Sequence, residues 1–141
     1  MGLTALLCAV PALADNANFG TLSLAPGFSS SEGIARGSTG GSFSLPAIAN
    51  SDYKQRLCLG YAGDKDVPDH ILVLQKNFAA LKLKVTSGRN KTTLLVKGPD
   101  GIIRCGKDQI EDSNWAAGTY KVWVGALEAG MRRDYKLTVQ E

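Results

Sequence analysis

Alternation between hydrophobic and polar residues dominates the second half of the sequence. The stretch "LKLKV" shows it most clearly, because Leu81, Leu83 and Val85 fall on one side of an extended chain and Lys82 and Lys84 on the other. The same period runs through "HILVLQ", "TTLLVKGPDG", "GTYKVWVGAL" and "DYKLTV", with Gly, Pro and Asp between the runs. No run of ten residues carries apolar side chains at helical spacing. The pattern predicts an all-β sandwich.

The first half has a different character. Residues 1–14, "MGLTALLCAVPALA", resemble the end of a secretory signal peptide cleaved after Ala14, although no basic residue precedes Arg36. The alternative is a buried N-terminal strand or helix. The apolar run is shorter than the roughly 20 residues of a transmembrane helix, so no membrane span is expected. We therefore predict a secreted or periplasmic protein.

The rest of the chain divides by composition. Residues 15–50 contain a short strand and a connection rich in Gly and Ser, and residues 29–42 are predicted to be flexible because they lack hydrophobic periodicity. Residues 51–141 form the sandwich, as one domain together with 15–50. The chain is 44% hydrophobic and 21% charged, with a net charge of +3, which is too small an excess to indicate a nucleic-acid partner.

Cysteine usage agrees with export. Cleavage after Ala14 removes Cys8 and leaves Cys58 and Cys105, which in an exported domain most simply form a disulfide. The alternatives are two free buried thiols or a metal pair. A zinc site would need four ligands, and the chain has one histidine.

Three motifs in the second half are similar to those of bacterial pre-peptidase C-terminal (PPC) domains. They are Pro99-Asp100-Gly101, Gly118-Thr119-Tyr120 and Tyr135-x-Leu137-x-Val139, within a resemblance that covers about residues 69–139. Ala117 stands where the family commonly has proline. The resemblance implies a secreted, jelly-roll-like antiparallel β-sandwich of about eight strands. Such domains are usually appended to exported proteases and sometimes bind calcium, collagen or other polymers. The chain also looks like the small, stand-alone secreted proteins of this type that cyanobacteria encode without assigned function.

Catalysis is not expected. His70 is the one histidine, so any Ser/His or Cys/His mechanism would have to use it. Alternation places it on the same side as Leu72 and Leu74, where a packed, hydrogen-bonded histidine is a simpler interpretation than a catalytic base. No Gly-x-Ser-x-Gly motif is present.

Two acidic segments are candidates for calcium, which prefers six to eight oxygen ligands. They are "GDKDVPD" and "DQIEDSN", and neither has EF-hand spacing. A Cys58–Cys105 bridge would allow the two segments to face each other. The alternative is that these are solvated turn residues. The candidate ligands are Asp64, Asp66, Asp69, Asp108, Glu111, Asp112 and Asn114.

The two tryptophans are the candidate contact residues. Tyr120 matches the family's core tyrosine, so Val122 and Val124 also face inward, and Trp123 points outward beside Lys121. Trp115, in the turn "EDSNW", is expected to plug one end of the sandwich, with ligand contact as the alternative. Alternation sends a further set of mostly basic residues outward: Lys82, Lys84, Leu95, Lys97, Lys136 and Thr138.

An outward tryptophan among lysines suits stacking on sugar rings and attraction to an anionic polymer. The alternative is that the lysines protect sheet edges and that residues 15–50 cover Trp123. The favoured hypothesis is a non-catalytic exported module that binds an extracellular or cell-envelope polysaccharide. The second hypothesis is a protein-interaction or protease-associated domain, with calcium as the one candidate cofactor.

Overall fold

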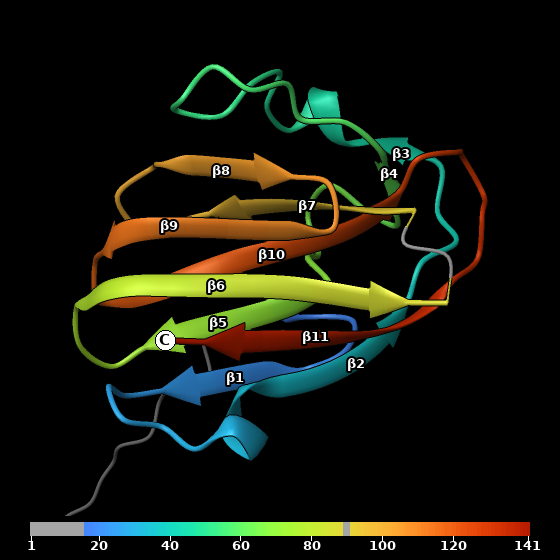
Figure 1. The fold of residues 1–141 in the computed structure, drawn as a ribbon. Coiled ribbons are helices and arrows are strands. Elements are labelled where there is room, and N and C mark those ends of the chain that lie inside the picture. Colours follow the sequence, from blue (N-terminus) through green and yellow to red (C-terminus); the bar gives the residue numbers. More distant parts are fainter. Residues whose placement is uncertain (1–15, 89–90) are drawn as a thin grey trace, which may run out of the picture.

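The computed structural model describes residues 16–88 and 91–141, and these form a sandwich of two β-sheets (Figure 1). The predicted signal peptide and Cys8 lie outside the described residues. The first sheet contains β1 (Thr21–Leu24), β3 (Phe43–Ser44), β4 (Tyr61–Ala62), β5 (His70–Leu74), β7 (Thr92–Lys97), β8 (Ile103–Gly106) and β10 (Gly118–Ala126). The second contains β2 (Ile34–Ser38), β6 (Phe78–Ser87), β9 (Gln109–Trp115) and β11 (Asp134–Gln140).

The predicted all-β sandwich is confirmed. The second sheet has the order β2-β11-β6-β9 and is antiparallel throughout. In the first sheet β10 is the central strand. It pairs with β5 along its first half, with β7 along its second half and with β4 at Ala126. The parallel pair β1–β5 is a departure from a purely antiparallel sandwich. The described residues form eleven strands, more than the eight or so expected, because β3, β4 and the strands of the N-terminal segment add to those that alternation identifies.

The main core lies between the sheets and follows the alternation. Leu81, Leu83 and Val85 of β6 are buried in it, and so are Leu137 and Val139 of β11. The opposite side of the second sheet is open, with Lys84 exposed and Lys82 half-buried. Alternation therefore predicts this part of the fold residue by residue.

A second, smaller core lies on the outer side of the first sheet. It consists of Leu45, Cys58, Ala62, Leu95, Cys105 and Trp123, with Ile48, Ala49 and Ile103 packed against it. The segment that covers this side includes β3, the 3₁₀ helix η3 (Leu45–Ala47), β4 and the residues between them (Figure 1). The outward direction of Leu95 is confirmed, but its expected position on the surface is wrong, since Leu95 is fully buried.

Two segments adopt structures that the sequence did not predict. Residues 29–42 were expected to be a flexible connection, but they contain the 3₁₀ helix η2 (Ser30–Gly33) and strand β2, which pairs with β11. Residues 111–115 were expected to be a turn, but they belong to β9 and pair with β6. Backbone pairing with a neighbouring strand fixes both segments, and such pairing needs no hydrophobic period. Across the described ranges, no helix has the length and apolar character needed to span a bilayer.

Candidate functional site

Trp123 points away from the main core, as predicted, but it is not a surface ring. Only 3% of its surface is exposed, because the second core closes over it. Its indole Nε1–H donates a hydrogen bond of 2.8 Å to the backbone oxygen of Asp64. A ring held in this way cannot stack face-on against a sugar, so the prediction of Trp123 as a stacking residue is wrong. The alternative, in which the N-terminal segment covers it, is correct in part: Leu45 and Ile48 come from that segment.

Trp115 fills the end of the main core. Its ring packs against Tyr120 at 5.6 Å between centroids, and the guanidinium of Arg104 lies 4.0 Å from the ring centroid. Its Nε1–H donates to the backbone oxygen of Asp112. The expectation of a plug is confirmed, and the alternative of ligand contact is wrong because the ring is buried.

His70 is a packed histidine, as expected. It is buried, and its Nε2 lies 2.7 Å from the hydroxyl oxygen of Tyr135. Burial lowers the pKa of His70 to about 4. Asp69, beside it, accepts hydrogen bonds from the backbone N–H of Val124 and from the side-chain amide of Asn18. The two hydrogen bonds lower the pKa of Asp69, but burial outweighs them, so the pKa is raised. Asp69 therefore stabilises the fold from within and is not a calcium ligand.

Asp112 also has a role other than the predicted one. Its carboxylate accepts hydrogen bonds from Arg104 Nε at 2.8 Å, from Lys54 Nζ at 3.0 Å and from the Tyr53 hydroxyl. Burial opposes ionisation, but the bonds from these three groups outweigh it and hold the pKa of Asp112 well below its usual range. Asp112 is thus neutralised by protein cations.

The acidic segments do not assemble into a cluster. Within residues 16–88 and 91–141, no three His, Cys, Asp or Glu side chains are grouped so that they could hold a metal ion. The expectation that the two segments face each other as one site is therefore wrong, and calcium binding stays a prediction without a ligand set. The other candidate ligands are at least partly solvated: Asp64, Asp66, Asp108, Glu111 and Asn114.

The predicted disulfide is confirmed. Cys58 and Cys105 are joined, with 5.3 Å between their Cα atoms, and both are buried in the second core. The bridge ties residues 51–60, which we call the tethered loop, to strand β8. Figure 1 shows this part of the chain projecting beyond β8 at the edge of the molecule.

Asp52 organises the tethered loop from inside. Its buried carboxylate accepts the backbone N–H groups of Lys54, Arg56 and Cys105, and also Arg56 Nε at 3.0 Å. Burial opposes ionisation, but these hydrogen bonds outweigh it and lower the pKa of Asp52. Gln55, at the tip, has a φ of 68°, in the left-handed region that costs a non-glycine residue about 1 kcal/mol. The loop therefore has one defined conformation that does not depend on regular strand pairing.

The outer side of the tethered loop is apolar and basic. Leu57 is 69% exposed and Leu59 is 44% exposed, on either side of the buried Cys58. Tyr53 and Arg56 are also exposed. A hollow of about 340 Å³ lies between Leu57, Leu59 and the β8–β9 turn.

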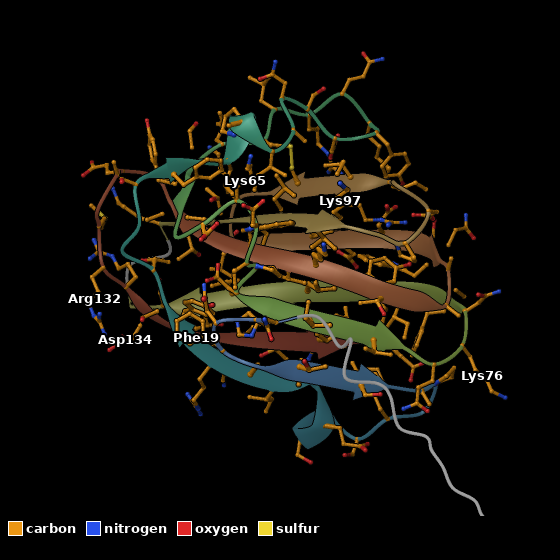
Figure 2. The ribbon with its side chains drawn as sticks, turned by 180° about the vertical axis from the view of Figure 1, so that it is seen from behind. Phe19, Lys65, Lys76, Lys97, Arg132 and Asp134 are labelled. Atoms are coloured by element: carbon orange, nitrogen blue, oxygen red, sulfur yellow. A yellow bond between two sulfur atoms is a disulfide. The ribbon has the colours of Figure 1, made fainter. Side chains whose placement is uncertain are left out.

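A second feature lies on the outer side of the first sheet. Lys97 of β7 is directly opposite Lys121 of β10, and Lys65 reaches the same place from the segment between β4 and β5 (Figure 2). With Trp123 beneath them, these residues surround a depression of about 270 Å³, which we call the lysine pocket. It is also lined by Ala47, Ile48 and Asp66.

Sequence reasoning missed the tethered loop and Arg104. The loop has no periodic pattern, and the one available signal was the pair of leucines around Cys58 in "RLCLG". Arg104 is fully buried because Asp112 and Trp115 surround its guanidinium, and these partners lie eight and eleven residues further along the chain. A charged residue in an otherwise apolar strand, followed by an aspartate, was a signal for a buried ion pair.

Comparisons with known proteins give little further information. No family model and no curated protein matches the chain. A solved structure with a similar arrangement is that of Aeromonas hydrophila PliG, a periplasmic lysozyme inhibitor of g-type lysozyme. The match has 16% sequence identity and a TM-score of 0.42, and it covers 90% of this chain and 98% of that one. No functional property is carried over from a match at this level, and the resemblance to PPC domains stays a prediction.

Proposed function

We propose that the protein is a non-catalytic, exported protein-binding module whose contact surface is the tethered loop. The observation that carries the proposal is the exposure of Leu57 and Leu59 on either side of Cys58, which is buried and bridged. Folding does not require two large apolar side chains in solvent. A bound partner would remove them from water, at a gain of about 2 kcal/mol for each leucine.

The internal bonds of the loop support this role. A loop that is already ordered loses little conformational entropy on binding, so more of its contact energy remains as affinity. Here Asp52 and the disulfide supply that order. Tyr53 and Arg56, beside the leucines, are residue types that often dominate the energy of protein interfaces.

The shape and charge of the loop specify the kind of partner. Because the loop projects from the sandwich, it fits a concave surface (Figure 1). Lys107 is exposed beside the leucines and forms no ion pair within the described residues, whereas Lys54 and Arg56 are paired with Asp112 and Asp52, so a mainly apolar cleft with a carboxylate at its rim would be complementary. The disulfide suits an oxidising compartment, which agrees with export. His70 is buried, so no exposed histidine is present for catalysis. The resemblance to PPC domains, which usually accompany exported proteases, also favours an accessory role.

Site-specific photo-crosslinking tests this function. A photoreactive phenylalanine analogue at position 57 should give a discrete adduct with a protein from the exported fraction of the producing cells. The same analogue at Lys76, an exposed residue that Figure 2 shows at the margin of the molecule, is the matched control and should give none. Equal labelling from both positions, or no adduct, would contradict the proposal.

The partner identified in this way then serves as a quantitative probe. Leu57→Ser with Leu59→Ser should weaken its affinity by about 30-fold or more, since each truncation removes at least about 1 kcal/mol of contact. The melting temperature should fall by only a few degrees, because Leu57 is 69% exposed and Leu59 is 44% exposed. An unchanged affinity would show that the adduct at position 57 came from chance proximity.

A further inference from the structure

We propose that the lysine pocket is a second binding site, which takes an anionic group of an acidic extracellular polysaccharide. The proposal is independent of the tethered loop. The ligand class is the polysaccharide first suggested by the outward tryptophan and lysines. The binding is now assigned to lysine amines and no longer to stacking on Trp123. The amines of Lys65, Lys97 and Lys121 would contact the anion, and Trp123 would form the floor.

The arrangement of the lysines is the first argument. Lys97 and Lys121 are paired across neighbouring strands, and like charges in directly opposite positions destabilise a sheet. Within the described ranges neither residue forms an ion pair, and neither does Lys65. Asp66 also lines the pocket, so the local balance is three positive charges against one negative. An anion between the amines would relieve the repulsion.

The support behind the pocket is the second argument. Trp123 is held by its bond to the Asp64 backbone oxygen, and the same bond fixes the segment that carries Lys65. Lys97 and Lys121 stand on β7 and β10, in the middle of the first sheet. The three amines are therefore presented from anchored backbone, which reduces the entropy lost on binding.

The dimensions and lining specify the ligand class. A volume of about 270 Å³ is just below the usual range of ligand pockets, so it accommodates one charged substituent or sugar of a longer chain. Ala47 and Ile48 give an apolar wall against which the C–H face of a sugar can lie. Single-stranded nucleic acid binds largely by stacking its bases on exposed aromatic rings, and Trp123 is only 3% exposed. The confirmed disulfide suits compartments outside the cytoplasm, where acidic polysaccharides occur.

Titration calorimetry with defined polymers tests the proposal. Dextran sulfate and alginate are the charged probes, uncharged dextran is the neutral probe, and sodium sulfate is the small-anion probe. We expect the charged polymers to bind, with affinity that falls as salt is added, and the other two to bind at least tenfold more weakly. Equal binding of neutral dextran would overturn the proposal. Equal affinity for free sulfate would show a small-anion site in its place.

A matched pair of double variants separates the pocket from general charge attraction. Lys97→Gln with Lys121→Gln should weaken binding of dextran sulfate by about tenfold. Lys84→Gln with Lys136→Gln removes the same charge from the outer side of the second sheet and should change the affinity by less than about twofold. Equal losses in the two double variants would overturn the proposal.

The two tryptophans provide a positional readout. In a ¹H–¹⁵N NMR spectrum the indole N–H signal of Trp123 should shift on addition of dextran sulfate, while that of Trp115 in the main core should not. Binding without a shift of Trp123 would place the polymer elsewhere. The double variant Leu57→Ser with Leu59→Ser should bind dextran sulfate normally, so a failure of this site and a failure of the tethered loop can be told apart.

Discussion

The two cores of the molecule are built by different means. The main core is filled by side chains that alternate along β6, β10 and β11, so each strand contributes one complete face. The second core is filled by single residues from η3, the tethered loop, β4, β7, β8 and β10, and it is closed by the disulfide. A β-sheet has two sides, and the pattern of its strands determines only which residues belong to each side. Whether a side becomes a core depends on what the rest of the chain lays over it.

This difference gives each core its own chemical sensitivity. The second core contains the disulfide and so responds to a reductant. His70, buried beside Tyr135 of the main core, makes that end of the sandwich sensitive to acid. The cores can therefore be perturbed separately.

Removal of the disulfide should have the largest effect. Replacement of Cys58 and Cys105 by alanine opens a loop with a sequence separation of 47 residues, for which chain entropy gives a loss of about 4 kcal/mol in the free energy of unfolding. Urea denaturation measures that loss. Hydrogen exchange should show that the hydrogen-bonded backbone amides of Asp52 and Arg56 lose protection before those of β6. A loss below about 1 kcal/mol would mean that hydrogen bonds, those of Asp52 included, order the tethered loop without the bridge.

Acid should act on the other core. Because the pKa of His70 falls from 6.5 to about 4 on folding, the unfolded chain binds the proton more readily between these values. The stability contributed by neutral His70 is complete above pH 6.5 and is lost as the pH falls toward 4, by up to about 3 kcal/mol. Asp69, whose pKa is raised, acts in the opposite direction near the lower end of this window.

The variant His70→Gln isolates the histidine, because both proteins retain Asp69. Urea denaturation at several pH values should show a flatter slope between pH 4 and 6.5 for the variant. Parallel slopes for the two proteins would place the acid sensitivity in another group.

A pair of leucines allows the packing of the two cores to be compared directly. Leu83 in the main core and Leu95 in the second are both fully buried. We expect Leu83→Ala to cost about 3 kcal/mol and Leu95→Ala about 2 kcal/mol, because a core covered by loops can collapse around the missing atoms more easily than two facing sheets can. Urea denaturation of both variants measures the difference. An equal or larger cost at Leu95 would show that the second core is as rigid as the first.

The sequence predicted what depends on local pattern. The inward faces of β6 and β11, the outward direction of Trp123, the packed His70 and the Cys58–Cys105 bridge all follow from alternation or from counting residues. Covering of Trp123 by residues 15–50 was one of two alternatives, and alternation could not decide between them because Leu45 and Ile48 lie in a segment without periodicity. The position of β2 is fixed by its pairing with β11, about a hundred residues away, which no local window contains.

The candidate site was predicted less well than the fold. Lys121 does line a pocket, but Trp123 is its floor and presents no exposed ring. Of the proposed calcium ligands, Asp69 and Asp112 are occupied by hydrogen bonds from the protein, since buried carboxylates must find donors. The tethered loop was missed because its order comes from one buried carboxylate and one covalent bond rather than from hydrophobic spacing.

The position of β1 and β2 also determines the order in which the fold can be completed. β1 pairs with β5 in the first sheet, and β2 pairs with β11 in the second, so two consecutive strands close one margin of each sheet. A ribosome makes β2 early and its partner β11 about a hundred residues later. Until then β2 presents unpaired backbone, which is the kind of segment that aggregates or engages a chaperone. The β2–β11 pairing thus joins a strand near the start of the chain to the last strand, and it cannot form before β11 is available.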